Sequence, residues 1–295
     1  MNMRIDAHQH FWQPARGDYA WLRPDDGALA PLVRDFLPEH LQGDLRAHGI
    51  AQTVLVQAAD SQAETEFLLD LAAHHDFIGA VVGWVDLSRA DAAETLEDWA
   101  RDLKFTAKFK GVRPMLQDLR EDDWIATAPH PEAVRAMLRL GLRFDALVHP
   151  RHLEPLLRFL RQWPELPVVI DHAAKPQLAE GWDASWAPAW RRLMPEIARL
   201  PQVSCKFSGL LTQAPPAARA STDGAVTALR PVWDHLLQWF GPQRLMWGSD
   251  WPVLTLAGSY GGWIDVSRAL IDELSPEEQA LVWQGTARRL YGLGT

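Results

Sequence analysis

Eight short apolar runs, rich in β-branched residues, alternate along this chain with stretches that have the spacing of amphipathic helices. Strands that alternate with helices are typical of parallel sheets, because each parallel connection must cross back over the sheet. Eight such units without a break in composition predict one α/β domain over residues 1–295, a single (β/α)8 barrel of the TIM type. The runs span residues 4–11, 53–59, 78–87, 109–115, 142–149, 167–172, 203–209 and 244–250.

Helix signals separate these runs. Pro38 suits the first turn of a helix and Gly49 its end, and Ser61 precedes Glu64 with the spacing of a capping box. The expected helices span residues 38–48, 61–75, 91–103, 131–140, 151–163, 186–200, 222–240, 259–273 and 276–289. Two long segments, 13–37 and 214–223, carry turn-forming residues, and we expect them to be loops over the barrel mouth.

An open, doubly wound sheet is the alternative arrangement of the same elements. That fold needs a glycine-rich phosphate loop directly after its first strand. Here the first strand runs into the sequence His-Gln-His-Phe-Trp, which contains no glycine. The closed barrel is therefore favoured.

Composition narrows the range of partners. The chain carries 29 Lys and Arg against 38 Asp and Glu, a formal net charge of −9. This charge disfavours a nucleic acid or an anionic membrane surface, since both require clustered basic residues. Cys205 is the only cysteine, so neither an intrachain disulfide nor a cysteine-based metal site can form. No apolar run suits a signal peptide or a membrane span, and we expect a cytoplasmic protein that acts on a small molecule.

The end of the first run offers a pair of metal ligands. Side chains alternate along a strand, so His8 and His10 point to one face. Two imidazoles placed in this way can bind a divalent metal such as zinc through nitrogen. Taken alone, a His-x-His pair near a terminus is more often an ordinary surface feature.

Three further strand ends strengthen the interpretation. His149 ends the fifth run, His172 ends the sixth, and Asp250 ends the eighth. A carboxylate directly after an apolar run is costly if it is buried without a partner. Each residue alone is best explained as a hydrogen-bonded core or loop residue. Together they mark the C-terminal ends of barrel strands, where barrel enzymes place their active sites.

This pattern of His-x-His, two later histidines and a late aspartate resembles the amidohydrolase superfamily. Five sequence segments spread over essentially the whole chain resemble the sugar-lactonase branch of that superfamily: IDAHQHFW, FKGVRPM, IDHAAKP, CKFSGL and LMWGSDWP. The resemblance implies a hydrolase of carbohydrate metabolism that opens an aldonolactone, such as L-fuconolactone, to its acid with the help of a metal. It also implies that His8, His10, His149, His172 and Asp250 are the candidate metal ligands.

One position departs from the pattern of the superfamily. Its binuclear members carry a carboxylated Lys or a Glu at the end of the fourth strand, where it bridges two metals. Arg113 stands there in this chain, and its cation cannot bind a metal. The sequence therefore argues against two metals and favours one divalent ion, zinc by the type of its ligands, with a metal-free site as the alternative.

The catalytic roles follow from lactone chemistry. Asp250 is our candidate for the general base that takes the proton of the attacking water and returns one to the ring oxygen. His172 is expected to polarise the carbonyl group or to orient the water, as could its neighbour Asp171.

Six further residues are candidates for binding the substrate. Arg113, Lys206 and Gln57 could donate hydrogen bonds to sugar hydroxyls or to the carbonyl oxygen, although structural ion pairing is the alternative for the two cations. Trp12, Trp251 and Tyr260 could pack on the apolar face of the sugar ring, with core packing as the alternative.

Rival functions remain open at this level. A decarboxylase or a pyrone-dicarboxylate lactonase would use the same scaffold, but a dianionic substrate should require several arginines in the site. A non-enzymatic sugar-binding protein would not need the His and Asp set. The sequence leaves open which sugar is bound, its ring size and the oligomeric state.

Overall fold

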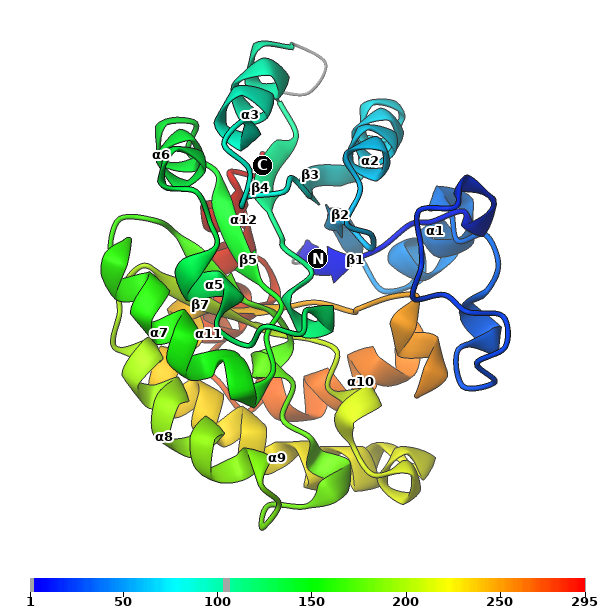
Figure 1. Ribbon diagram of the computed structural model, residues 1–295. Coiled ribbons are helices and arrows are strands. Elements are labelled where there is room, and N and C mark those ends of the chain that lie inside the picture. Colours follow the sequence, from blue (N-terminus) through cyan, green and yellow to red (C-terminus); the bar gives the residue numbers. More distant parts are fainter. Residues whose placement is uncertain (1–2, 103–106, 295) are drawn as a thin grey trace.

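The computed structural model describes residues 3–102 and 107–294. Eight strands pair in chain order, each parallel to the next, and helices surround them (Figure 1). The strands are β1 (Arg4–Gln9), β2 (Ile50–Val56), β3 (Ile78–Gly83), β4 (Phe109–Val112), β5 (Arg143–Ala146), β6 (Val168–Ile170), β7 (Val203–Phe207) and β8 (Leu245–Trp247). This arrangement confirms the predicted (β/α)8 barrel.

The barrel is nearly closed by contacts between its first and last strands. Gln9 pairs with Trp251 in a parallel bridge just beyond the end of β8. The His10 N–H donates to Trp251 O at 2.7 Å, and the Asp250 N–H donates to His8 O at 2.8 Å. These bonds hold the C-terminal ends of β1 and β8 side by side.

A β-bulge interrupts the alternation of β1. Between Asp6 and Gln9, this strand has one residue more than the paired interval of β2. Asp6, where the bulge begins, points away from the interior and accepts a hydrogen bond from Tyr260 Oη at 2.9 Å. Within the bulge, Ala7 joins the apolar cluster inside the barrel, and the side chain of His8 also faces inward, toward Lys206 and Asp171.

The outer helices follow the predicted order. They are α1 (Pro38–Ala47), α2 (Gln62–His74), α3 (Ala92–Arg101), α5 (Trp124–Thr127), α6 (Pro131–Arg139), α7 (Leu153–Gln162), α8 (Trp186–Ala198), α9 (Thr222–Phe240), α10 (Tyr260–Ile271), α11 (Pro276–Ala280) and α12 (Thr286–Tyr291). Residue 103, the predicted end of the third helix, lies outside the described residues. The helix predicted over 276–289 is present, and a π-helical turn at Leu281–Gly285 lies within it between α11 and α12.

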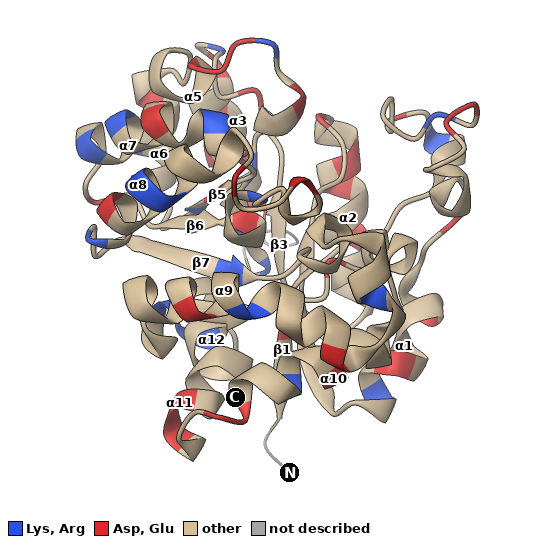
Figure 2. Cartoon of the chain, turned by 90° about the horizontal axis from the view of Figure 1, so that it is seen from below, with Lys and Arg blue, Asp and Glu red and all other residues tan. Residues whose placement is uncertain are grey.

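Apolar side chains fill two regions. The smaller cluster lies inside the barrel, and the larger one lies between the strands and the helices. The inner cluster includes Ile5, Ala7, Val54, Val56, Ala80, Val82, Val169 and Met246. Acidic and basic residues are both spread over the outer helices (Figure 2). No helix among the described residues has the length and apolar character that a bilayer crossing requires.

Candidate active site

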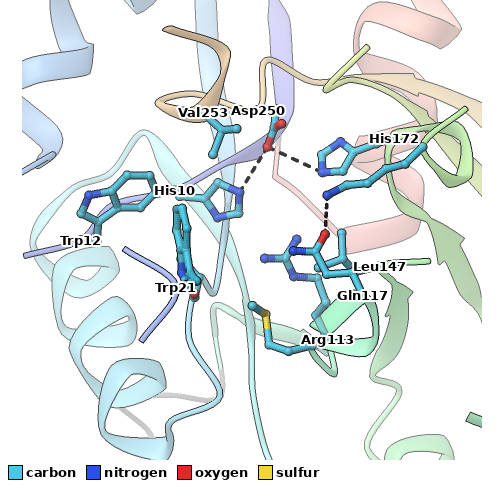
Figure 3. Close-up of a pocket in the computed structure, with 12 residues that line it drawn as sticks. His10, Trp12, Trp21, Arg113, Gln117, Leu147, His172, Asp250 and Val253 are labelled. Carbon is cyan, nitrogen blue, oxygen red and sulfur yellow. Dashed lines mark hydrogen bonds and ion pairs between the residues drawn. The ribbon is translucent and has the colours of Figure 1, made fainter. Parts of the chain in front are cut away.

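The C-terminal ends of the strands enclose a cavity of about 490 Å³, its open mouth included. Loops after β1, β2, β4, β5, β6 and β8 supply its walls (Figure 3). The lining residues are His10, Trp12, Trp21, Ala58, Arg113, Met115, Gln117, Leu147, His172, Lys175, Asp250 and Val253. Barrel enzymes carry their active sites at this same end.

Three imidazoles converge on the carboxylate of Asp250. Its Oδ1 lies 3.3 Å from His10 Nε2, 3.6 Å from His172 Nε2 and 3.8 Å from His8 Nε2. The Nε2 atoms of His8 and His10 lie 3.2 Å apart. Figure 3 shows His10 and His172 on either side of the carboxylate. The structure thus brings together four of the residues that the sequence singles out, from β1, β6 and β8.

Burial sets the charge of this cluster. It lowers the pKa of His172 to about 4, and it also lowers the pKa values of His8 and His10, so the three imidazoles are neutral near pH 7. Burial alone would raise the pKa of Asp250, but the neighbouring histidines outweigh it and hold that pKa below its usual range. An ionised carboxylate among neutral imidazoles can act as a base and as a metal ligand.

The donor atoms of His8, His10 and Asp250 fit one divalent ion. Their separations of 3.2, 3.3 and 3.8 Å are close to the ~3.4 Å that tetrahedral zinc coordination produces. The Nδ1 of His10 lies 2.7 Å from Val56 O, which fixes the ring proton on Nδ1. The lone pair of Nε2 is then available to a metal.

The neighbours of His8 decide whether its Nε2 is available to the same metal ion. Its Nδ1 lies 3.1 Å from Lys206 Nζ and 3.3 Å from Asp171 Oδ1. Only a proton on Nδ1, facing the Asp171 carboxylate, leaves Nε2 free for a metal. Arg113 Nη1 lies 3.4 Å from His8 Nε2 and 3.3 Å from Asp171 Oδ2. A guanidinium is a cation without a free lone pair, so Arg113 cannot bridge two metal ions from this position.

A buried ion-pair network lies behind the cavity. Lys206 Nζ lies 2.6 Å from Asp145 Oδ2 and 3.0 Å from Asp171 Oδ1, and the Tyr291 hydroxyl donates to Asp145 Oδ2 at 2.8 Å. All four side chains are fully buried. Lys206 is not among the residues that line the cavity, so its ammonium serves the ion pair that the sequence left as an alternative.

Five other predicted residues are also absent from the cavity lining, and of these only His8 belongs to the cluster around Asp250. His149 belongs to neither group of close-set metal-ligand side chains among the described residues, and its N–H donates to His152 Nδ1 at 3.1 Å. Gln57 Nε2 donates to Arg113 O at 2.5 Å and thereby supports Arg113. Trp251 packs edge-on against Phe11 and Phe36, and the hydroxyl of Tyr260 is bonded to Asp6 outside the barrel.

Several lining residues escaped the sequence analysis. Trp21 comes from the long loop after β1, and its Nε1 donates to Ala58 O at 2.7 Å. Lys175 and Gln117 come from the loops after β6 and β4 and are hydrogen-bonded to each other. The only signal for Lys175 was its place in the word IDHAAKP, three residues after His172.

Comparison with known proteins agrees with this geometry. An amidohydrolase family profile matches residues 5–293. An L-fucono-1,5-lactonase from Burkholderia ambifaria is 45% identical over 295 residues, covering 99% of this chain and 96% of the relative. An L-fucono-1,5-lactonase from Burkholderia multivorans is 39% identical over 296 residues, with the same coverage. A crystal structure of an amidohydrolase from Burkholderia multivorans with bound Zn is 36% identical, covers 99% of this chain and 100% of its own, and has a TM-score of 0.88. This chain therefore belongs to the amidohydrolase family.

Proposed function

We propose that this protein hydrolyses a sugar lactone to the open aldonic acid, with L-fucono-1,5-lactone as the first candidate substrate, and that residues 1–295 form one catalytic domain. The observation that carries the proposal is the ionised Asp250 among neutral imidazoles in a cavity at the C-terminal end of the barrel. The two lactonase relatives, similar over nearly the full chain, support the substrate class.

The reaction starts with the activation of water. Asp250 takes a proton from a water molecule, whose oxygen attacks the carbonyl carbon of the lactone. His172, whose Nδ1 lies 2.9 Å from Ser208 Oγ, is held with its Nε2 toward the same carboxylate and orients the water. When the tetrahedral intermediate collapses, the bond from C1 to the ring oxygen breaks and Asp250 returns the proton to that oxygen.

One metal ion suits this site. We assign it to His8 and His10, with Asp250 as the third donor, and propose zinc because of the nitrogen-rich donor set and the Zn-bound relative. Such an ion supplies a Lewis acid that polarises the carbonyl group and lowers the pKa of bound water.

The walls of the cavity suit a neutral sugar ring. Trp12 and Trp21 bring aromatic rings to the lining, and Met115, Leu147 and Val253 extend its apolar part. Arg113 is the only arginine among the lining residues that the structure describes, which does not favour a dianionic pyrone dicarboxylate.

A panel assay tests the proposal. Acid release from L-fucono-1,5-lactone, its 1,4 isomer, other aldonolactones and 2-pyrone-4,6-dicarboxylate is followed with a pH indicator, and the metal content of the same sample is measured. We expect turnover of aldonolactones, with the fuconolactones the best, and no more than one divalent ion per chain. Turnover confined to the pyrone, or hydrolysis of no lactone, would reject the function. Two ions per chain would reject the assigned site.

A further inference from the structure

Four consecutive residues after β6 adopt left-handed backbone conformations. The φ angle is 53° at His172, 53° at Ala173, 60° at Ala174 and 48° at Lys175. None of them is glycine, and each such residue costs about 1–2 kcal/mol in a left-handed helical conformation. Strain of this kind persists only where the surroundings fix it, and it concentrates at functional sites.

The surroundings fix this turn from two sides. Trp190 Nε1 of α8 donates to Ala173 O at 2.8 Å, and the side chains of Ala173 and Ala174 are fully buried. Within the turn, the Lys175 N–H donates to His172 O at 2.8 Å. The turn thus sends two side chains, three residues apart, into the same cavity: His172 and Lys175 both line it.

The ammonium of Lys175 meets a neutral partner there. Its Nζ donates to Gln117 Oε1, and Figure 3 draws this bond as the dashed line that ends at Gln117. Gln117 is itself held in place, because Arg151 Nη2 donates to its backbone carbonyl oxygen at 2.9 Å and its own Nε2 donates to Asp118 Oδ2 at 3.2 Å. Within residues 3–102 and 107–294, Lys175 forms no ion pair within 4.0 Å. Burial lowers the pKa of Lys175, and the carboxylate of Asp250 is the charge that most opposes this lowering.

The contrast with the other cation of the cavity is informative. Both terminal nitrogens of Arg113 already have protein acceptors, Gln57 O for one and Asp171 Oδ2 for the other. Lys175 is a cation with only an amide oxygen to satisfy it. The Lys175 side chain is partly buried and has no charged partner among the described residues, so an oxygen of the ligand is the natural acceptor for its remaining N–H groups.

We propose that Lys175 binds the ester group of the lactone and stabilises the negative charge that develops on its C1 oxygen. The proposal rests on the lactone hydrolysis proposed above. As the oxygen of water bonds to C1, the carbonyl electron pair moves onto the C1 oxygen, and Lys175 donates a hydrogen bond to it. The water proton goes to Asp250 and then to the departing ring oxygen, so Lys175 remains protonated throughout.

The test removes the charge and keeps the length of the side chain. Lys175→Met should lower kcat about 10²–10³-fold, the loss typical of one oxyanion donor, with a smaller change in KM. Calorimetry should show that the variant binds L-fuconate, the carboxylate product, at least tenfold more weakly than the wild type. Its affinity for 1,5-anhydro-L-fucitol, the same ring without an oxygen on C1, should be unchanged.

Control variants isolate the charge. Lys175→Arg keeps a cation and should recover part of the lost rate. Lys108→Met removes a half-buried ammonium that donates to Ala72 O at 2.6 Å, away from the cavity lining, and should change neither rate nor affinity. If thermal unfolding shows that Lys175→Met is not folded, Lys175→Gln keeps a donor without the charge and carries the same expectation.

Three other results would overturn the proposed role of Lys175. Equal losses of affinity for L-fuconate and the anhydrofucitol would place Lys175 on a ring hydroxyl and overturn the proposal. Unchanged kcat and affinities would also overturn it and leave the lactonase function intact. A wild-type protein that hydrolyses no lactone would instead reject the proposed function, and the role of Lys175 with it.

Discussion

Single residues in this site owe their chemistry to burial as much as to their type. His172 has a pKa of about 4 because it is withdrawn from water, and Asp250 stays ionised because three histidines surround it. The sequence could predict that these residues meet, since each follows a strand of the barrel. It could not predict Lys175, because only the left-handed turn carries that side chain into the cavity.

Lys206 is a residue whose role the sequence could not decide. Its place on β7 made it a candidate for substrate binding. In the folded chain Asp145 and Asp171 come from β5 and β6, and they meet the ammonium only after the barrel has closed. The sequence carries no local sign of these partners, so the two uses of Lys206 could not be separated beforehand.

Asp250→Asn tests the base at the residue scale. The amide keeps the size of the side chain and loses its basicity, so kcat should fall at least about 10²–10⁴-fold. The variant should fold, because Asp250 has a φ of 60°, a conformation that Asn tolerates well. The KM for the lactone should change less than kcat, and initial rates with metal analysis on the same sample measure both effects.

The exposed Asp265 on α10 provides the matched control. Asp265→Asn makes the same chemical change outside the cavity and should leave kcat at the wild-type value. A folded Asp250→Asn protein with unaltered metal content and near-normal kcat would remove Asp250 from its role.

Secondary-structure elements position the site through their irregular ends. The bulge in β1 lets Ala7 fill the barrel while His8, the next residue, also faces inward. Regular alternation in the sequence placed His8 and His10 on one face but gave no sign of the extra residue. The predicted runs also extend beyond the strands, as in 142–149 against β5. Leu147 and Val148 after that strand are buried as deeply as strand residues, so hydropathy cannot separate them.

Gly209, in the loop after β7, allows a prediction at the element scale. Its φ is +63°, and a Cβ there would lie 2.5 Å from His172 Nδ1 and 2.9 Å from Asp250 Oδ2. Gly209→Ala should therefore displace both side chains and lower kcat by more than about tenfold, beyond a stability cost of ~1–2 kcal/mol for the backbone strain. Kinetics and urea unfolding measure the two effects separately.

Gly141→Ala separates strain from collision. Gly141 has nearly the same φ, +64°, and no atom lies within 4 Å of its built Cβ. This variant should lose a similar amount of stability and keep the wild-type kcat. Equal kcat values for the two variants would show that the close approach at Gly209 does not hold the catalytic side chains in place.

At the scale of the whole molecule, the strand order is the feature that the sequence predicts best. Eight β-then-α units have one simple solution in a parallel sheet, and the strands do pair in chain order. The last helix was also predicted, but its π-helical turn at Leu281–Gly285 was not, because that turn does not interrupt the apolar pattern. His149 was expected at the site from its strand position and from the family resemblance, and its contact with His152 depends on the local turn after β5.

Oxygen labelling tests the central claim most directly, that water activated by Asp250 attacks the lactone carbonyl. A single turnover of L-fucono-1,5-lactone is run with excess enzyme in H₂¹⁸O, and the L-fuconate formed is analysed by mass spectrometry. The account predicts that the product of this first turnover carries one ¹⁸O atom, in its carboxylate. An unlabelled first-turnover product would show that Asp250 attacks the carbonyl itself, and a label on the ring hydroxyl would show cleavage on the other side of that oxygen. Either result would contradict the account.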